Sequence, residues 1–428
     1  MRIDSVNSTF ERQPLRRPFG FKGSAMTNVW QTAVRLNDPE GRHRIGLGTQ
    51  NVLWSDSRVF ANHSESGGNA LMYAMTERAL QMIRGRAFDD PLAMLDMILE
   101  EVLAYGRQIT GQPDLRTTFA LNALVPVDNA AWLLYADLLG IDTFDDLIPG
   151  AYRGGLSARH KAVASIPALG YGTPIEEIKA LADDGYFIMK IKIGAPGTQA
   201  EMLERDKAFL KAIHEAIGQY TTPHLDGARI PYYFDANGRY EKHETLHRFL
   251  DFAEKIGALE QIAVLEEPFG ERNQESVEEL AARGPRIAAD ESAHTDTDTL
   301  TRIQQGYNAI AVKAIAKTLS MTMRMAQVAY ENDVPCFCAD LTVNPILVDW
   351  NKCVAARLPA FPGLQLGLQE TNGWQNYQYW ENMQNHHPIP DAPWTKTVHG
   401  IYPTDSAFYQ HSGGIFLPSA HYEGLLGG

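Results

Sequence analysis

The chain has 428 residues, a formal net charge of −14 and 44% hydrophobic residues. This acidic balance argues against nucleic acid or an anionic membrane surface as a partner, and no apolar run reaches the roughly 20 residues that a membrane-spanning helix needs. The three cysteines include no CxxC pair, and the N-terminal segment lacks the apolar core of a signal peptide. We therefore expect a cytoplasmic globular protein, with one large barrel and a smaller domain or with two to three ordinary domains.

The first part of the chain, about residues 1–130, is predicted to be an α+β domain. Two β-rich stretches, residues 28–36 and 43–53, flank the turn sequence DPEG and predict a hairpin. Two helical patterns follow, the second ending near residue 108. Residues 17–26 contain glycines and phenylalanines without periodicity, which indicates either a mobile loop that closes over a ligand or a linker.

From residue 161 onward, short apolar segments alternate with amphipathic helical patterns. Eight of these segments are expected to be parallel strands, and their spacing favours an α/β fold with a (β/α)8 TIM barrel over about residues 131–370. An open doubly wound sheet is the alternative, but no glycine-rich phosphate-binding turn opens any of the helices. A C-terminal segment, about residues 371–428, is expected to pack on the first domain. The predicted strands are AVASIPAL, FIMKIKIG, YYFDANG, IAVLEEPF, RIAADES, NAIAVKAI, VPCFCAD and GLQLGL.

The second predicted strand, residues 187–194, carries two lysines in an otherwise apolar run. Lys190 and Lys192 are two residues apart, so their side chains point to the same face of the strand. Two ammonium groups on a buried face repel each other and lose hydration, which core packing alone would not select. The strand is either a half-exposed edge strand or the carrier of a lysine base whose pKa is pulled toward neutrality by its neighbour and by burial.

Acidic residues end the next three predicted strands: Asp235 in FDANG, Glu266 and Glu267 in LEEPF, and Asp290 and Glu291 in AADES. Catalytic groups of a (β/α) barrel lie at the C-terminal ends of its strands. Three carboxylates that converge there form an oxygen-ligand site for a hard dication such as Mg²⁺, although any single acid could instead cap the next helix. Strand alternation predicts that only one acid of each adjacent pair faces the metal.

The sixth predicted strand contributes another cation, Lys313. Strands two and six lie across a barrel from each other, so Lys192 and Lys313 could flank a substrate carbon from opposite faces. Lys317 falls in the loop or helix start that follows, where a solvated lysine is expected. Glu370 at the end of strand eight and Asp340 after strand seven could contact the substrate or cap a helix.

These motifs, taken in order, resemble the enolase superfamily. Within it they are most similar to the muconate-lactonizing and dipeptide-epimerase-like branch of the mandelate racemase group. The resemblance implies a modified (β/α)7β barrel with an N-terminal α+β capping domain, whose loops near residues 17–26 and 51–55 shape specificity. It also implies a homo-oligomer and an isomerase or lyase that acts on a small-molecule carboxylate. The motifs are Lys190-x-Lys192, Asp235-Ala-Asn237, Glu266-Glu267-Pro268, Asp290-Glu291-Ser292 and Lys313.

The resemblance also implies roles for these residues. Mg²⁺, with Mn²⁺ as a substitute, would be held by Asp235, Glu266 and Asp290. Lys192 would be a base on one face of the substrate and Lys313 a base or acid on the other. Lys190 would lower the pKa of Lys192 or touch the substrate carboxylate. The remaining polar residues would support the site, with Glu291 as a partner of the lysine on strand six; these residues are Asn237, Glu267, Glu291 and Glu370.

A proton alpha to a carboxylate is weakly acidic, and its removal gives an enediolate that a dication and an ammonium group stabilise. Two opposed lysines suit an epimerase, a racemase or a cycloisomerase, and they also suit a dehydratase that expels a β-leaving group. The chain has VPCFCADL where acid-sugar dehydratases carry a histidine, and LGLQETNGW where dipeptide epimerases carry Asp-x-Asp, so both substrate classes are in doubt. A catalytically silent barrel is the third hypothesis, disfavoured because both lysines and all three acids are present. The substrate itself cannot be read from the sequence.

Overall fold

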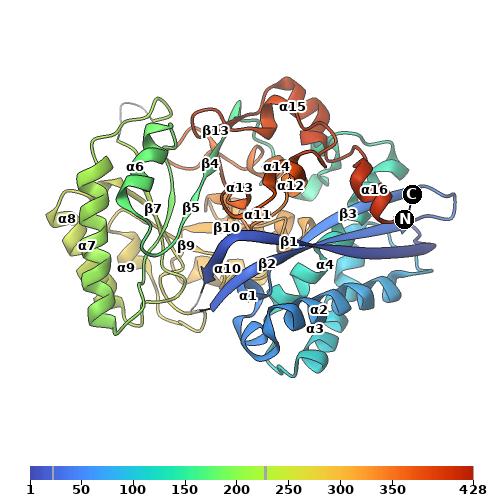
Figure 1. Ribbon diagram of the computed structural model, residues 1–428, viewed down its shortest axis with the longest axis horizontal. Helices are drawn as coiled ribbons and strands as arrows, with labels where there is room; N and C mark the ends of the chain where they lie inside the picture. Colours follow the sequence, from blue (N-terminus) through green and yellow to red (C-terminus); the bar gives the residue numbers. More distant parts are fainter. Residues whose placement is uncertain (22–23, 226–228, 428) are drawn as a thin grey trace.

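The computed structural model describes residues 1–21, 24–225 and 229–427. An N-terminal antiparallel sheet with its helices lies beside a larger curled parallel sheet that is surrounded by helices (Figure 1). None of the described helices is long and apolar enough to cross a lipid bilayer. The N-terminal elements are β1 (Ser5–Phe21), β2 (Ser24–Asn37), β3 (His43–Gln50), α1 (Val52–Ser55), α2 (Ser57–Ile83), α3 (Pro91–Thr110) and α4 (Thr117–Leu139).

The N-terminal sheet confirms the predicted hairpin, because β2 and β3 pair antiparallel. The prediction of a loop or linker at residues 17–26 is wrong for the residues that the structure describes. There β1 and β2 form an antiparallel pair that extends to Phe21 and Ser24, and residues 22–23 lie outside the described part. The ribbon is held by pairs across the strands, such as Phe10 stacked on Trp30 with ring centroids 4.0 Å apart. Periodicity within one strand does not reveal such pairs.

Helix α4 packs directly on β3, and two glycines make this close approach possible. A Cβ atom on Gly46 would lie 2.1 Å from the carbonyl oxygen of Pro126, and one on Gly48 would lie 2.5 Å from the Pro126 ring. Any larger residue would push the helix off the sheet. The predicted boundary at residue 130 falls inside α4, and the division into domains stays a prediction.

Asp128 in α4 is buried against α11 (Leu319–Glu331), where it accepts hydrogen bonds from the backbone N–H and the hydroxyl of Ser320. Burial, only partly offset by these hydrogen bonds, raises the pKa of Asp128 from 3.8 to about 6. A carboxyl group with a raised folded-state pKa destabilises the fold once it must ionise. The destabilisation caused by ionising Asp128 is therefore absent below about pH 4 and complete above about pH 6.

We expect Asp128→Asn to become more stable than the wild type as the pH rises from 4 to 7, by about 1–3 kcal/mol at pH 7. The amide stays neutral and can still accept from the Ser320 N–H group. Urea unfolding of both proteins across this range measures the difference, and comparison with the wild type cancels the other titrating groups. A difference that does not widen with pH would contradict this assignment.

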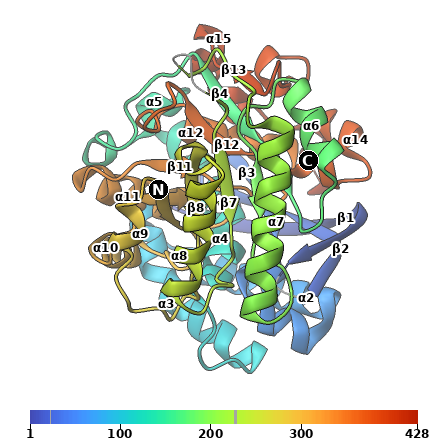
Figure 2. The ribbon, with the colours of Figure 1, turned by 90° about the vertical axis from the view of Figure 1, so that its left-hand side faces the viewer.

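Eight parallel strand positions form the barrel, as predicted. The sheet order is β13-β4-β12-β11-β10-β9-β8-β7-β6-β5. Only Pro167 separates β4 from β5, so the two form one continuous segment. This segment joins both ends of the parallel sheet, because β4 pairs with β12 and β5 pairs with β6. Figure 2 shows the strands inside a layer of helices. The strands are β4 (Ala162–Ile166), β5 (Ala168–Leu169), β6 (Lys190–Lys192), β7 (Tyr232–Asp235), β8 (Ile262–Glu266), β9 (Arg286–Ala289), β10 (Ala309–Val312), β11 (Cys336–Cys338) and β12 (Gly367–Glu370).

The barrel helices follow the predicted alternation. Helix α7, for example, begins with a capping box. The Thr198 hydroxyl accepts a hydrogen bond from the backbone N–H of Glu201, and the Glu201 carboxylate accepts one from the backbone N–H of Thr198. Helix α9 is shorter than the predicted helix at residues 275–282. The helices of this part are α5 (Phe144–Leu147), α6 (Ile175–Asp183), α7 (Gln199–Ile217), α8 (His243–Lys255), α9 (Glu278–Ala281), α10 (Asp296–Gln304), α11 and α12 (Pro345–Ala355).

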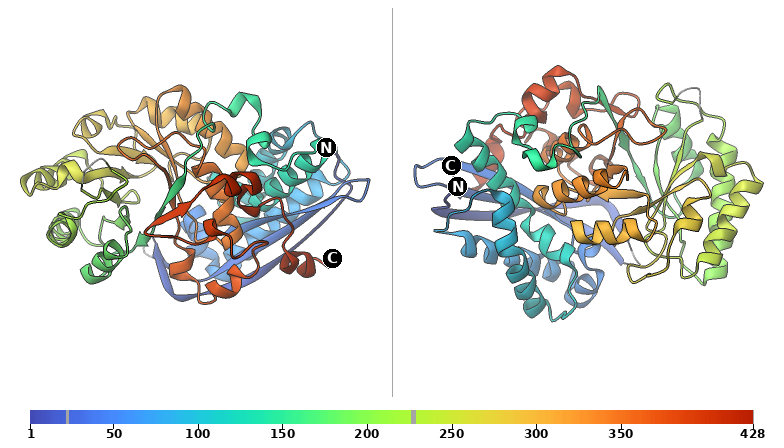
Figure 3. Two further views of the ribbon diagram at one scale, coloured as in Figure 1. Left: turned by 90° about the horizontal axis from the view of Figure 1, so that it is seen from above. Right: turned by 180° about the vertical axis from the view of Figure 1, so that it is seen from behind.

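The C-terminal segment crosses from the barrel to the N-terminal sheet. Its strand β13 pairs antiparallel with β4, an addition to the eight predicted strands. Tyr377 forms an isolated antiparallel bridge with Leu15 of β1. Both views of Figure 3 place the two chain termini at the same end of the molecule. The elements are α13 (Gly373–Asn376), α14 (Trp380–Gln384), β13 (Ile401–Pro403), α15 (Ser406–His411) and α16 (Ala420–Leu425).

Candidate active site

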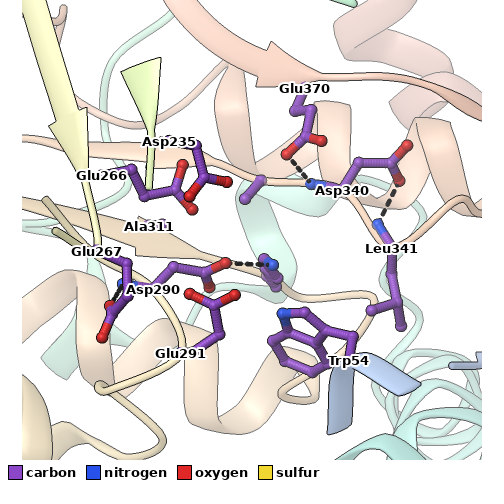
Figure 4. A network of polar contacts seen from close by, with 12 residues as sticks. Trp54, Asp235, Glu266, Glu267, Asp290, Glu291, Ala311, Asp340, Leu341 and Glu370 are labelled. Carbon is purple, nitrogen blue, oxygen red and sulfur yellow. Dashed lines mark hydrogen bonds and ion pairs between the residues drawn. The ribbon is translucent and has the colours of Figure 1, made fainter. Parts of the chain in front are cut away.

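The register of the barrel sheet brings the predicted site residues to one end. Lys192 pairs with Asp235, and Asp235 in turn pairs with Glu266, so the last residues of β6, β7 and β8 lie side by side. Asp290 and Lys313 directly follow β9 and β10. Figure 4 shows the acidic side chains of these strand ends grouped in one region. Polar groups at the carboxyl ends of barrel strands occupy the position where barrel enzymes act.

Both lysines of β6 point into this region. The Nζ of Lys190 lies 3.0 Å from Asp235, 2.8 Å from Glu266 and 3.2 Å from Glu370. The Nζ of Lys192 contacts Asp235 and donates to the side-chain oxygen of Asn237 at 2.7 Å. The edge-strand interpretation is therefore wrong, because β6 is paired on both sides.

Electrostatics in this region are dominated by burial and by opposite charges. Burial opposes the ammonium form of Lys190, but Asp235, Glu266 and Glu370 outweigh it and raise the pKa of Lys190 well above its ordinary value. Burial likewise opposes the charged form of Asp235, yet Lys190 and Lys192 lower its pKa to about 2. For Glu266, burial and the neighbouring carboxylates, Asp235 first, raise the pKa. Lys190 thus stays an ammonium group beside Lys192.

Three carboxylates form a compact oxygen set. One oxygen from each of Glu266, Asp290 and Glu291 lies within 4.8 Å of the other two, and all three side chains are buried. Asp235, predicted as a ligand, contacts the two lysines and is not in this set. Glu291 Oε2 is buried without a hydrogen-bond partner. A buried, unpaired carboxylate oxygen among other acids fits a hard dication such as Mg²⁺, which prefers oxygen ligands.

The prediction that only one acid of each adjacent pair faces the metal holds for Glu266 and Glu267 and fails for Asp290 and Glu291. Glu267 turns away from the oxygen set and accepts hydrogen bonds from the backbone N–H groups of Asp290 and Ser292 and from the Ser292 hydroxyl. Burial, followed by the charge of Glu291, raises the pKa of Glu267 to about 8. Asp290 and Glu291 both belong to the set, contrary to expectation, because they lie beyond the end of β9, where strand alternation no longer applies.

The contacts of Glu291 differ from the one implied by the resemblance, which made it a partner of Lys313. Glu291 accepts from the side-chain amide of Asn237, and its backbone oxygen accepts from Arg116 at 2.6 Å. The carboxylate beside Lys313 is Asp290 rather than Glu291, at 2.6 Å. Asn237 and Glu267 have positive φ values of 45° and 41°, a strained conformation that is common near functional sites.

Lys313 and Lys317 both contact Asp290. The Nζ of Lys317 lies 2.9 Å from the Asp290 carbonyl oxygen and 3.3 Å from its carboxylate. The expectation of a solvated Lys317 is wrong, since its side chain is fully buried. The chain turns back after β10, with the Lys317 N–H donating to the Lys313 carbonyl at 2.7 Å, and this turn carries Lys317 inward. The ring of Trp54 lies 4.3 Å from the Nζ of Lys313, a cation–π contact.

Glu370 and Asp340 occupy the other side of the region. Glu370 accepts from the backbone N–H of Asp340 at 3.0 Å and from the side chain of Asn372 at 3.1 Å. Asp340 accepts backbone N–H bonds from Leu341 at 2.7 Å and from Asn372 at 2.8 Å. Burial, followed by the charge of Glu370, raises the pKa of Asp340 to about 7. Asp340 thus braces the loops after β11 and β12 and does not cap the next helix, because the N-cap of α12 is Asn344.

A cavity of about 450 Å³ lies over these groups. Both Lys192 and Lys313 line it, together with side chains of the N-terminal part such as Phe19, Met26 and Trp54. A neighbouring cavity of about 1000 Å³ shares Phe19 and Lys192 with it. Sequence reasoning offered residues 17–26 as a ligand-covering loop or a linker and located residues 51–55 through the resemblance, but it identified no individual residue there. Trp54 carries no sequence signal, because its role depends on a contact with the distant Lys313.

Comparisons with known proteins agree with this architecture. A model of the enolase C-terminal domain-like family matches residues 175–392. No curated protein sequence matches the chain.

Solved structures with the same overall fold share little sequence with this chain. A dipeptide epimerase from Enterococcus faecalis V583, complexed with Mg and the dipeptide L-Leu-L-Tyr, is 18% identical with a TM-score of 0.62, covering 87% of this chain and 90% of that one. The L-Ala-D/L-Glu epimerase from Bacillus subtilis is 17% identical with a TM-score of 0.63, covering 87% and 89%. A mandelate racemase/muconate lactonizing protein from Herpetosiphon aurantiacus is 15% identical with a TM-score of 0.65, covering 94% and 95%. At these identities the likeness shows the fold.

Proposed function

The chain belongs to the enolase superfamily, in its mandelate racemase and muconate lactonizing group, and we propose that it is an epimerase or racemase that removes and returns a proton alpha to a substrate carboxylate. One observation carries the proposal: Lys192 and Lys313 line the same cavity. They lie on β6 and β10, which are four positions apart in an eight-stranded barrel. Two bases on opposite sides of a carbon are what inversion at that carbon requires.

The lysines exchange the proton in the proposed reaction. Lys192, in its neutral form, accepts the α-proton on one face of the substrate, and the ammonium group of Lys313 donates a proton to the other face. In the opposite direction their roles reverse. Lys190, which stays protonated among three carboxylates, places a positive charge on the same face of β6 as Lys192. Trp54 covers Lys313 and excludes water from its side of the cavity.

We propose Mg²⁺, with Mn²⁺ as a substitute, as the cofactor, held by Asp235, Glu266 and Asp290. Glu291 would lie beside it, since its unpaired oxygen belongs to the compact oxygen set. When bound, the dication supplies positive charge against which the negative charge of the deprotonated substrate develops. The dipeptide epimerase from Enterococcus faecalis is an example of this fold with Mg bound.

We expect Asp235→Asn to weaken Mg²⁺ binding by about 10-fold or more and Glu291→Gln to weaken it less. Asp235 counters the charges of both Lys190 and Lys192, so its loss leaves two ammonium groups facing the incoming dication. Glu291 instead accepts from the side-chain amide of Asn237 at 3.0 Å. Calorimetric titration with Mg²⁺, supported by Mn²⁺ electron paramagnetic resonance, measures both variants. The opposite order would make Glu291, rather than Asp235, the third ligand.

The reaction is tested by proton NMR in D₂O with Mg²⁺. The substrates are acid sugars, N-acyl amino acids, dipeptides and hydroxyproline-type acids. Loss of the α-proton signal with an unchanged skeleton and a new epimer supports the proposal. A keto acid product would instead identify a dehydratase, and a cyclised product would identify a cycloisomerase. A protein that binds Mg²⁺ but exchanges no α-proton across all four classes would contradict the proposal and favour a catalytically silent barrel.

A further inference from the structure

Three side chains with metal-binding groups meet far from the barrel mouth, where the two ends of the chain come together. They are Glu11 in β1, His386 after α14 and His421 in α16. One donor atom from each lies within 4.8 Å of the other two, and all three residues are half-buried. Figure 1 shows α16 beside the N-terminal sheet, close to both termini. We call these three residues the terminal cluster.

The contacts within the terminal cluster leave one imidazole without a hydrogen bond. The Nε2 of His421 lies 2.9 Å from each carboxylate oxygen of Glu11. The ring of His386 stacks on that of His421 with centroids 3.6 Å apart and planes 6° apart. Within the described parts of the chain, neither ring nitrogen of His386 has a hydrogen-bond partner. The ring nitrogens of His386 are therefore available as metal ligands.

The backbone around His386 is held firmly from both sides. The next residue, His387, is buried, and its Nδ1 accepts a hydrogen bond from the backbone N–H of Ile389 at 3.1 Å. The Ser419 hydroxyl, just before α16, donates to the His386 carbonyl oxygen at 2.6 Å. The two histidine-bearing backbone segments are therefore fixed relative to each other before any ion binds, and only the side chains have to reorient.

We propose that the terminal cluster is a second metal site, which takes a borderline divalent ion such as Zn²⁺. Two imidazole nitrogens and one carboxylate oxygen suit Zn²⁺, and they do not suit Mg²⁺, which prefers oxygen ligands alone. Because all three residues are half-buried, a fourth position is open to water. The ion would lie between the Nε2 of His421 and the carboxylate of Glu11, which now contact each other directly. The rings also rotate out of their parallel stack, since lone pairs of parallel rings do not converge.

A metal ion bound by the terminal cluster would cross-link the first strand of the N-terminal sheet to the C-terminal segment. An ion that binds only the folded chain raises the apparent stability. The site is independent of the proposed reaction, because none of its three residues lines the cavity at the barrel mouth.

The test uses the full chain without a histidine tag, in saturating MgCl₂ to occupy the barrel site. We expect calorimetric titration with ZnCl₂ to give one equivalent bound at micromolar affinity or tighter, and thermal unfolding to show a raised melting temperature. Co²⁺ should give visible absorption bands with the intensity of a four-coordinate site. His386→Phe keeps a ring to stack on His421 but removes both nitrogens, and it should weaken Zn²⁺ binding about 10-fold or more.

The matched control is His43→Phe. It removes an imidazole on β3 that pairs with Glu423 of α16 at 3.0 Å, and it should leave Zn²⁺ binding unchanged. No Zn²⁺ binding by the wild type, or equal binding by wild type and His386→Phe, would reduce the terminal cluster to a histidine–glutamate ion pair with a stacked ring. Zn²⁺ binding that Asp290→Asn removes and His386→Phe leaves intact would place the ion at the barrel mouth and refute the proposal.

Discussion

Lys192→Ala is expected to abolish epimerisation in both directions, lowering its rate by about 10²–10⁴-fold, the usual contribution of a positioned acid or base. One epimer should still exchange its α-proton with D₂O, because Lys313 faces that proton and can remove and return it on the same side. Lys313→Ala should show the converse, with exchange retained only in the other epimer. Fitting exchange and epimer formation separately by NMR measures both rates.

The fold should survive Lys192→Ala, because Asp235 keeps its contact with Lys190 at 3.0 Å. Lys179→Ala is a suitable control, since that lysine makes an exposed ion pair with Asp183 on α6 and should not affect either rate. If Lys192→Ala stops exchange from both epimers while Lys313→Ala stops neither, one base serves both faces and the two-lysine mechanism is wrong.

Asp290→Asn is expected to lose about 3–5 kcal/mol of stability, the typical cost of breaking a buried ion pair by removing one partner. The side chains of Lys313 and Lys317 are at most 2% exposed, so both buried ammonium groups would lose the carboxylate with which they form an ion pair. Burial opposes ionisation of Asp290, but Lys313 and then Lys317 lower its pKa below the ordinary 3.8. Its stabilisation is therefore complete above about pH 4 and declines as the pH falls. Urea unfolding at pH 7 measures the full effect.

A second variant separates ion pairing from metal binding. Adding Lys317→Met to Asp290→Asn removes one of the two uncompensated charges, which should restore about 1–2 kcal/mol of stability. It should not restore Mg²⁺ binding, because the ligand carboxylate is still absent. Equal stability of wild type and Asp290→Asn would mean that the two lysines find other partners. Undiminished Mg²⁺ affinity in the variant would remove Asp290 from the proposed ligands.

The acidic strand ends were predictable because they depend on local rules. A period of two residues fixes which side chains of a buried strand share a face, and parallel strands of a barrel end at a common mouth. Lys190, Lys192 and Asp235 therefore meet where the sequence predicts them, as the register of β6 and β7 confirms. The family resemblance rests on the same motifs, and the match over residues 175–392 bears it out.

Contacts between distant segments could not be predicted in this way. The burial of Lys317 depends on how the chain turns after β10, and the place of Glu291 in the oxygen set depends on where β9 stops. The hairpin of β1 and β2 depends on pairing between two strands, neither of which shows the full pattern alone. Trp54 reaches Lys313 only because the N-terminal part closes over the barrel mouth.

The sequence by itself determined the barrel, the acids and the lysines of its mouth, because each follows from spacing within a single strand or a single strand–helix unit. Only the tertiary structure decided which carboxylate pairs with which lysine, which side chains close the cavity, and that Glu11, His386 and His421 meet. These outcomes depend on packing between segments hundreds of residues apart. Side-chain contacts made at such distances leave no periodicity in the chain.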